Sequence, residues 1–241
     1  MTQALLAGKG LTQRAHDNGH QLLKPTDFEL AAGARVAVTG SSGSGKSVLM
    51  RTRALLDLPS SGSIFFRGQP ISLEPQNIAH YRSEVAYVRQ QPVLLSGSVL
   101  DNLMFPYTLQ RYRQQKFNKD FIIKALTQLG KDKDFLQRDG TELSGGEAQL
   151  VCLLRVIQLN PPVLLLDEPT ASLDETSVRQ VQQLVHNWQL SRDDAAYIWV
   201  SHSEEQYRAV GDVLWIVENG SISHIESQYS GEQHADNTNS K

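Results

Sequence analysis

The sequence predicts an α/β fold built on a mostly parallel β-sheet. Residues 35–39 are predicted to form a short buried strand, which a glycine-rich turn connects to a helix over residues 47–56. Residues 163–166 form a continuous apolar run, and residues 197–200 form another. Such runs are typical of parallel strands that are covered on both faces. Strands that alternate with helices in this way favour a parallel sheet with helices on its faces.

The remaining segments add strands, helices and a tail to this core. Further strands are predicted at residues 63–67, 84–89, 213–217 and 222–225, and further helices at residues 121–129 and 178–188. The last two strands can pair as a hairpin around Asn219 and Gly220. Residues 92–160 show helical patterns and little strand signal, so we expect a helical subdomain there. We expect a single domain over residues 1–226 and a polar, disordered tail over residues 227–241.

Length, charge and cysteine content limit the classes of function. The 241 residues suffice for one well-buried domain with a subdomain. The net charge is -3 and the Lys and Arg residues are scattered, which argues against a nucleic-acid-binding protein. Cys152 is the only cysteine, so an intramolecular disulfide is excluded and a reducing cytosol fits. The sequence shows no leader and no stretch near the roughly 20 apolar residues that cross a bilayer, so we expect any membrane role to act through a partner.

Residues 40–47 match the pattern GxxxxGK[ST] between a predicted strand and a predicted helix, which is the context that a phosphate-binding loop requires. Glycines let the backbone wrap around phosphate oxygens, while amide groups and the helix N-terminus supply partial positive charge. Lys46 adds a full charge, and the Ser47 hydroxyl can bind Mg²⁺. The alternative is a flexible Gly/Ser loop. The candidate phosphate-binding residues are Gly40, Ser41, Ser42, Gly43, Ser44, Gly45, Lys46 and Ser47.

Asp167 and Glu168 follow the apolar run and are expected at the carboxyl edge of the sheet, where open α/β folds bind ligands. We expect Asp167 to act on the Mg²⁺ side through a water molecule. Glu168 is then placed to polarise the attacking water, and a general base of this kind contributes roughly 10²- to 10⁴-fold to a rate. The alternative is an acidic pair that ends a strand in solvent.

Residues 143–147 (LSGGE) allow two interpretations. Ser144 and Glu147 have the spacing of a capping box at the start of a helix, which residues 160–162 (NPP) would end. This interpretation gives the segment a structural role only. A capped helix start also presents backbone N–H groups that favour an anion, so a structural role and a binding role are compatible.

The order of these motifs resembles the ATP-binding cassette (ABC) superfamily. Its signature motif reads LSGGQ or LSGGE and lies between a phosphate loop and a strand such as VLLLDEP, which is the sequence of residues 163–169 here. The resemblance covers nearly the whole chain. It implies a P-loop NTPase core with a mostly parallel sheet, an antiparallel β subdomain and a helical subdomain that carries the signature.

Three further positions match the family in order. Gln90 resembles the Q-loop glutamine, which senses Mg²⁺ and faces the permease. Asp174 resembles the aspartate of the D-loop, and His202 resembles the switch histidine that contacts the γ-phosphate. Each residue alone is more often an ordinary surface or core residue, and their common order carries the assignment.

The resemblance implies an ATPase that uses ATP and Mg²⁺. Two copies close head to tail, so that each ATP lies between the phosphate loop of one copy and Ser144, Gly145 and Gly146 of the other. Because the γ-phosphate supplies the contacts that distinguish the open from the closed state, ATP shifts this equilibrium and ADP does not. We expect a separate integral membrane permease as a partner, a cytoplasmic location on the inner face of the cell membrane, and no nucleic-acid partner.

The sequence departs from the family pattern near the adenine. Many members stack adenine on an aromatic residue upstream of the phosphate loop, but residues 11–19 contain no Tyr, Phe or Trp. His16 is the nearest substitute, although a lone His is more often a surface residue. Stacking is worth roughly 1–3 kcal/mol, so we expect modest ATP affinity and poor discrimination between bases. In addition, Arg89 replaces a frequent proline, and Leu150 replaces a frequent basic residue.

Residues 90–107 are similar to the ATP-binding subunit of small bacterial iron-export ABC transporters. The sequence shows no cluster of His, Cys or carboxylates for iron, so we expect the permease to select the cargo. One alternative is a non-transport ABC ATPase acting on nucleic acid or ribosomes, which usually carries a coiled-coil insertion or a second cassette. Another is a small-molecule P-loop kinase, in whose chemistry LSGGE has no role.

Overall fold

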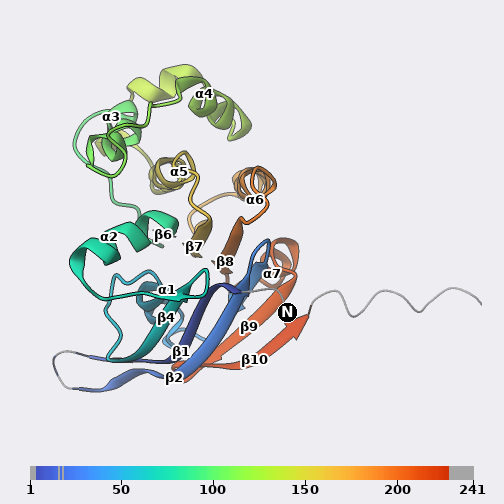
Figure 1. Ribbon diagram of the computed structural model, residues 1–241. Coiled ribbons are helices and arrows are strands. Elements are labelled where there is room, and N and C mark those ends of the chain that lie inside the picture. The colour runs from blue at the N-terminus through green and yellow to red at the C-terminus, as the bar shows by residue number, and fades with distance from the viewer. Residues whose placement is uncertain (1–3, 16, 18, 228–241) are drawn as a thin grey trace, which may run out of the picture.

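The computed structural model describes residues 4–15, 17 and 19–227. Its strands form two sheets (Figure 1). The six-stranded sheet has the order β10-β9-β3-β8-β7-β6, and all neighbouring strands in it are parallel except β10 and β9. Its strands are β3 (Arg35–Thr39), β6 (Val85–Val88), β7 (Val163–Asp167), β8 (Ala196–Val200), β9 (Val213–Glu218) and β10 (Ser221–Ser227). The prediction of an α/β fold with a mostly parallel sheet is confirmed.

The second sheet is antiparallel and has the order β2-β1-β4-β5. Its strands are β1 (Ala4–Arg14), β2 (Gln21–Ala31), β4 (Ser61–Phe66) and β5 (Gln69–Pro70). The sequence patterns predicted neither β1 nor β2. Several register shifts interrupt the pairing of β1 with its neighbours, so its buried residues do not alternate with exposed ones and the usual period of two is hidden.

Seven α-helices and three short 3₁₀ turns complete the described part of the chain. They are α1 (Lys46–Arg53), α2 (Pro75–Glu84), α3 (Val99–Met104), η1 (Phe105–Thr108), α4 (Lys119–Gln128), η2 (Lys133–Gln137), η3 (Gly140–Glu142), α5 (Gly145–Ile157), α6 (Glu175–Leu190) and α7 (Glu204–Val210). Residues 89–162 contain helices and no strand beyond one isolated bridge, and α3 and α4 lie at the opposite end of the molecule from β1 and β2 (Figure 1).

Several predicted boundaries differ from the structure by a few residues, and two of them differ for clear local reasons. The helix predicted over residues 47–56 ends at Arg53, because Leu55 adopts a left-handed conformation with φ 54°. The strand predicted over residues 84–89 starts one residue later, because Glu84 is the last residue of α2. The hairpin of β9 and β10 forms as predicted, with positive φ at Asn219 and Gly220. The predicted tail overlaps β10 at Ser227, and residues 228–241 lie outside the described residues.

The six-stranded sheet is buried on both faces. In β7, Leu164 and Leu166 pack into a cluster with α4, α5 and α6. Leu165 points to the other side, into a cluster with α1, α2 and the antiparallel sheet. Every residue of β7 is buried, which explains the unbroken apolar run in the sequence. The strands therefore form a rigid layer whose carboxyl edge carries polar residues.

Candidate active site

The phosphate loop joins β3 to α1 through glycines that no other residue can replace easily. Gly43 and Gly45 have φ values of 77° and 103°, in a region that residues with a Cβ rarely adopt. A Cβ at Gly40 would lie 2.2 Å from the carbonyl oxygen of Val217 in β9. The loop is therefore wound tightly against the edge of the sheet.

Lys46 spans this loop from the first turn of α1. Its Nζ donates hydrogen bonds to the carbonyl oxygens of Gly40 at 2.8 Å and Ser41 at 2.9 Å. The residue is only 6% exposed. Burial lowers the pKa of Lys46, and the nearby carboxylates of Glu168 and Asp167 oppose that shift. An ammonium group is thus held at the centre of the loop, where an anion would complete its coordination.

Asp167 is buried at the end of β7, and one of its oxygens has no partner. The Tyr87 hydroxyl donates to Oδ2 at 2.8 Å, whereas Oδ1 has no hydrogen-bond partner among the described residues. Burial raises the pKa of Asp167, while the hydrogen bond from Tyr87 and the nearby Ser47 hydroxyl lower it. A buried carboxylate oxygen without a partner, close to a hydroxyl, is a fitting ligand for a hard cation. Asp167 and Ser47 therefore fit a Mg²⁺ site.

Glu168 lies between two polar side chains that follow the neighbouring strands β6 and β8. Gln90 Nε2 donates to Glu168 Oε2 at 2.9 Å, and His202 Nε2 lies 2.7 Å from Glu168 Oε1. The backbone of Glu168 has a φ of 48°, a conformation that costs about 1–3 kcal/mol in a residue other than glycine. A small cavity of about 160 Å³ borders Glu168 and His202. The carboxylate is thus oriented by both neighbours at the edge of an open space.

The strand order explains why these distant residues meet. β3, β8, β7 and β6 are consecutive and parallel, so their carboxyl ends lie on one edge of the sheet. The phosphate loop follows β3, His202 follows β8, Glu168 follows β7 and Gln90 follows β6. This edge is where α/β sheets of this kind bind ligands.

The LSGGE segment forms the capping box that its spacing predicts. The Ser144 hydroxyl accepts from the Glu147 amide at 3.2 Å, and Glu147 Oε2 accepts from the Ser144 amide at 3.0 Å. Lys131 and Arg138 also bind Glu147 Oε1, at 2.9 and 2.7 Å. Burial raises the pKa of Glu147, but the hydrogen bonds from Lys131, Ser144 and Arg138 outweigh it and hold the pKa at about 2. The start of α5 is therefore locked by an ionised carboxylate.

The two glycines of this segment have different surroundings. A Cβ at Gly146 would lie 2.8 Å from Leu173 Cδ2 and 3.0 Å from the carbonyl oxygen of Ser172. These two residues precede Asp174 in the segment that resembles the D-loop, and their close packing requires glycine at position 146. A Cβ at Gly145 would meet nothing within 4 Å. Packing within the chain therefore explains Gly146 and does not explain Gly145.

Ser144 and Asp174 are not bonded to the phosphate loop of the same chain. Asp174 caps α6, accepting from the Ser177 amide at 3.0 Å and from the Ser177 hydroxyl at 2.8 Å, and these bonds lower its pKa. Among the described residues, the side-chain hydrogen bonds of Ser144 and Asp174 stay within the first turns of α5 and α6. The structure therefore gathers Gln90, Glu168 and His202 around one centre and leaves the signature apart from it.

Comparison with known protein families identifies the family to which this chain belongs. Residues 23–171, more than half of the chain, match the ABC transporter family. The chain belongs to the ABC transporter family. It is an ATP-binding subunit of an ABC transporter, and it hydrolyses ATP.

Individual relatives and solved structures agree with this assignment. The chain is 34% identical over 194 residues to the probable iron export ATP-binding protein FetA of Escherichia coli. This alignment covers 80% of this chain and 84% of that protein. It is 34% identical over 212 residues to ABC transporter I family member 17 of Arabidopsis thaliana, with coverage of 88% and 78%. CbiO1 of Clostridium perfringens, part of the ABC transporter complex CbiONQ, has a TM-score of 0.77 at 26% identity, covering 94% of this chain and 89% of that one.

A further solved structure shares the fold. The ATP-binding cassette MJ0796, in a dimeric post-hydrolysis state bound to ADP and Pi, has a TM-score of 0.82 at 22% identity. The alignment covers 93% of this chain and 99% of that one.

The departures from the family pattern have a structural setting in this ABC ATPase. Leu150 is 3% exposed and packs in the core under α5, where an apolar side chain is well placed. The carbonyl oxygen of Arg89 accepts a hydrogen bond from Gln149 Nε2 at 3.1 Å, so position 89 is held through its backbone. His16, the suggested substitute for an adenine-stacking aromatic, lies outside the described residues.

Sequence reasoning missed several residues that shape the ABC ATPase site. Gln149 and Arg155 on α5 bind the backbone on either side of Gln90. Gln149 donates to the carbonyl oxygen of Arg89, and Arg155 Nη2 donates to that of Val93 at 2.7 Å. Gln149, Cys152 and Arg155 are three residues apart and share one helix face, a spacing that could have revealed this contact. No sequence signal pointed to the hydrogen bond from Tyr87 to Asp167.

Proposed function

We propose that two copies of this chain close around two ATP molecules, each held by the phosphate loop of one copy and the LSGGE segment of the other. The supporting observation is the open space at Gly145, where packing within the chain does not require glycine. A glycine at such a position allows another molecule to approach the backbone closely. The amide groups at the start of α5 also favour an anion. Ser144, Gly146 and Asp174 would contribute to the same interface.

Within this proposal, the residues at the sheet edge bind the phosphates, hold Mg²⁺ or activate water. Lys46 and the amide groups of residues 40–45 would bind the phosphates. Ser47 and Asp167 would hold Mg²⁺, with Gln90 nearby, and the bound ion would offset the phosphate charge. Glu168 would polarise the attacking water while Gln90 orients its carboxylate.

His202 would share that orienting role and face the γ-phosphate. Its Nε2 lies 2.7 Å from Glu168 Oε1, so the two side chains can act as one unit. We also propose that residues 1–226 form one ATPase domain, with the helical subdomain over residues 92–160.

The substitution Glu168→Gln tests the central role. Glutamine keeps the size and an oxygen near Gln90 and His202, so the variant should bind Mg-ATP and form an ATP-dependent dimer. Turnover should fall by about 10²- to 10⁴-fold, because the general base is lost. Light scattering after gel filtration measures the dimer, and phosphate release measures the rate. Glu29→Gln is the matched control and should leave the dimer and the rate unchanged, because Glu29 is exposed on β2, outside the sheet whose edge carries Glu168. A variant that stays monomeric in Mg-ATP, or turns over at the parent rate, would refute the proposal.

We propose that the partner is a separate integral membrane permease and that this chain sits on the inner face of the membrane. No helix in the described ranges is long and apolar enough to span a bilayer. Large apolar side chains are exposed on the segment after the Q-loop and on α3 and η1. They are Val93 at 51%, Leu95 at 41%, Met104 at 44% and Phe105 at 39%. An exposed apolar patch of this kind marks a surface for protein contact.

The permease contact is tested by retrieving the tagged chain from solubilised native membranes. The parent should bring down a multi-span membrane protein, and Phe105→Asp should lose it. Leu190→Asp is the matched control, because Leu190 is 71% exposed on α6 and lies outside the patch. If both variants retrieved the membrane protein equally, the apolar patch would not be the permease contact.

For the cargo, we propose iron export, supported by the 34% identity to FetA. The described residues contain no group of three or more His, Cys, Asp or Glu that could hold a metal ion, so cargo selection would belong to the permease. Cells that lack this chain should accumulate iron under iron excess, and the parent gene but not Glu168→Gln should restore the normal content. Unchanged cell iron would exclude this cargo and leave the ATPase assignment intact.

A further inference from the structure

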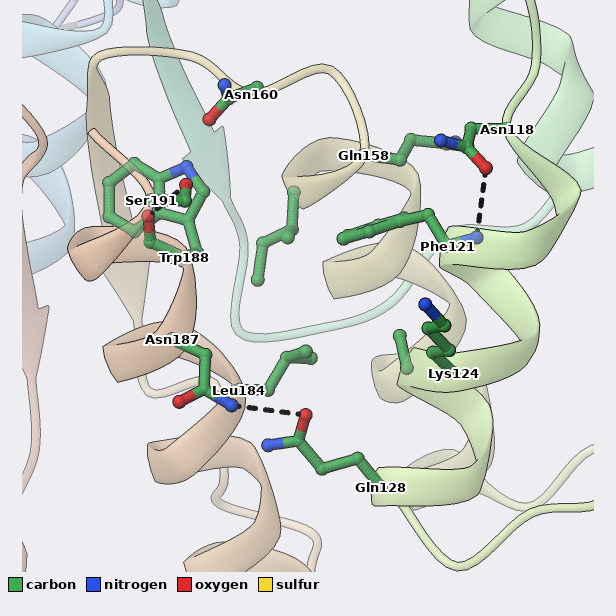
Figure 2. Close-up of a pocket in the computed structure, with 12 residues that line it drawn as sticks. Asn118, Phe121, Lys124, Gln128, Gln158, Asn160, Leu184, Asn187, Trp188 and Ser191 are labelled. Carbon is green, nitrogen blue, oxygen red and sulfur yellow. Dashed lines mark hydrogen bonds between the residues drawn. The ribbon is translucent and has the colours of Figure 1, made fainter.

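A pocket of about 470 Å³ lies between α4, the end of α5 and the second half of α6 (Figure 2). None of its lining residues belongs to the phosphate loop, the Q-loop or the LSGGE segment. Its volume is in the range of pockets that bind small organic molecules. The pocket is therefore a separate candidate site on the same chain.

The walls of the pocket are largely apolar. Phe121 of α4, Ile157 of α5, and Leu184 and Trp188 of α6 line it. Phe121 reaches from α4 toward the other two helices (Figure 2). These side chains offer a binding surface for an apolar ring or short chain.

Two side chains that line the pocket carry a buried hydrogen-bond donor without an acceptor. Trp188 is 5% exposed, and its Nε1 has no hydrogen-bond partner among the described residues. Gln128 Nε2 is also buried without a partner, while Gln128 Oε1 accepts weakly from Asn187 Nδ2 at 3.4 Å. Both donor atoms are closed to solvent, so a ligand would meet the ring of Trp188 and the side chain of Gln128 rather than these two nitrogen atoms.

The charge of the pocket fits an anion. Lys124 is the one charged residue among those that line it, and no carboxylate lines it. Figure 2 shows Lys124 on α4 beside Phe121, on the side that faces α5 and α6. A carboxylate at this position would find a cation and no opposing negative charge.

We propose that this pocket binds a small amphipathic monocarboxylate. Its apolar body would pack against Phe121, Ile157 and Leu184. Its carboxylate would accept hydrogen bonds from Lys124. Because α5 begins at Gly145 and α6 begins at Glu175, such a ligand would fix the spacing of two helices whose first turns border the proposed nucleotide interface.

The probe for this proposal is 4-phenylbutyrate, titrated calorimetrically into the full chain without nucleotide. We expect saturable binding of one molecule per chain at millimolar concentration, and weaker binding of the neutral 4-phenylbutyramide. Lys124→Glu should weaken the binding of 4-phenylbutyrate by about tenfold, because it removes the donor to the carboxylate. Lys119→Glu is the matched control, because Lys119 is also exposed on α4 but does not line the pocket, and it should leave the affinity unchanged.

The proposal is overturned if 4-phenylbutyrate does not saturate the chain, or if Lys124→Glu binds it as the parent does. Equal binding of 4-phenylbutyramide would remove the anion from the proposal and overturn it as stated. A loss of the retrieved membrane protein in Lys124→Glu, with the affinity for 4-phenylbutyrate unchanged, would assign the pocket to a protein contact. The readout is binding without nucleotide, so it does not depend on the proposed dimer.

Discussion

Alanine at the two adjacent glycines of the LSGGE segment should change the stability of the fold in opposite directions. At Gly146 the new Cβ would lie 2.8 Å from Leu173 Cδ2 and 3.0 Å from the Ser172 oxygen. Carbon atoms pack best at about 3.5–4.0 Å, so the D-loop would have to shift. Overpacking of this kind costs about 1–3 kcal/mol, and the lower entropy of the unfolded alanine chain returns about 0.4–1 kcal/mol. We expect Gly146→Ala to lose about 1–2 kcal/mol of stability.

At Gly145 nothing lies within 4 Å of the added Cβ, so only the favourable entropy remains. Gly145→Ala should therefore gain about 0.4–1 kcal/mol. In a domain of this size, 1 kcal/mol shifts Tm by about 2–4 °C. We expect Tm to rise by about 1–4 °C in Gly145→Ala and to fall by about 2–8 °C in Gly146→Ala.

Activity should follow a different rule from stability. Gly145→Ala places a methyl group where the second copy's nucleotide is proposed to lie, so it should fold better and still lose ATP turnover. Thermal unfolding without nucleotide measures the first property, and phosphate release measures the second. The ATP-dependent dimer can be measured for the same substitution combined with Glu168→Gln. If Gly145→Ala lowered Tm, the inference about open space would be wrong. If it kept the parent rate and the dimer, the proposed nucleotide interface would be wrong.

Three further predictions address the charged groups and the base. Burial raises the pKa of Asp167, so the negative charge of this carboxylate disfavours the folded state. Asp167→Asn should therefore keep or raise Tm without nucleotide and lose ATP turnover. A lower Tm would contradict this. The folded pKa of Glu147 is lowered from 4.5 to about 2, so the stability advantage of the parent over Glu147→Gln should be complete above pH 4.5 and vanish as the pH falls to about 2. Urea unfolding across that range tests it, and a constant difference would refute it. Because residues 11–19 offer no aromatic ring, GTP should compete with ATP within a few fold in a hydrolysis assay, whereas strong preference for ATP would be inconsistent with this.

The parallel strands were predictable because burial on both faces leaves a direct trace in the sequence. The run from Val163 to Leu166 is wholly apolar because both sides of β7 face the core. β1 left no such trace. Lys9 and Gly10 interrupt its apolar residues at a register shift, and the strand is recognisable only through its partners β2 and β4. Pairing between distant segments sets that element, and a local pattern does not contain it.

The candidate site shows the same division. The phosphate loop is contiguous, so its glycines and Lys46 were identified from spacing alone. The contacts that orient Glu168 join it to Gln90, 78 positions earlier in the chain, and to His202, 34 positions later (202 − 168). The order of the strands brings these residues together. The bond from Tyr87 to Asp167 likewise spans 80 positions. Such contacts follow from the fold, which is why sequence spacing named the residues but not their geometry.

α5 links the two surfaces on which the proposed function depends. Its first residue follows Ser144, and two side chains further along it, Gln149 and Arg155, donate to the carbonyl oxygens of Arg89 and Val93. Val93 is exposed on the patch proposed to meet the permease. A displacement of that patch must therefore either break these hydrogen bonds or carry α5 with it. Because an α-helix is stiff over 13 residues, the second course moves Ser144 as well. Closure of the proposed dimer would thus be transmitted through α5 to the patch proposed to meet the permease.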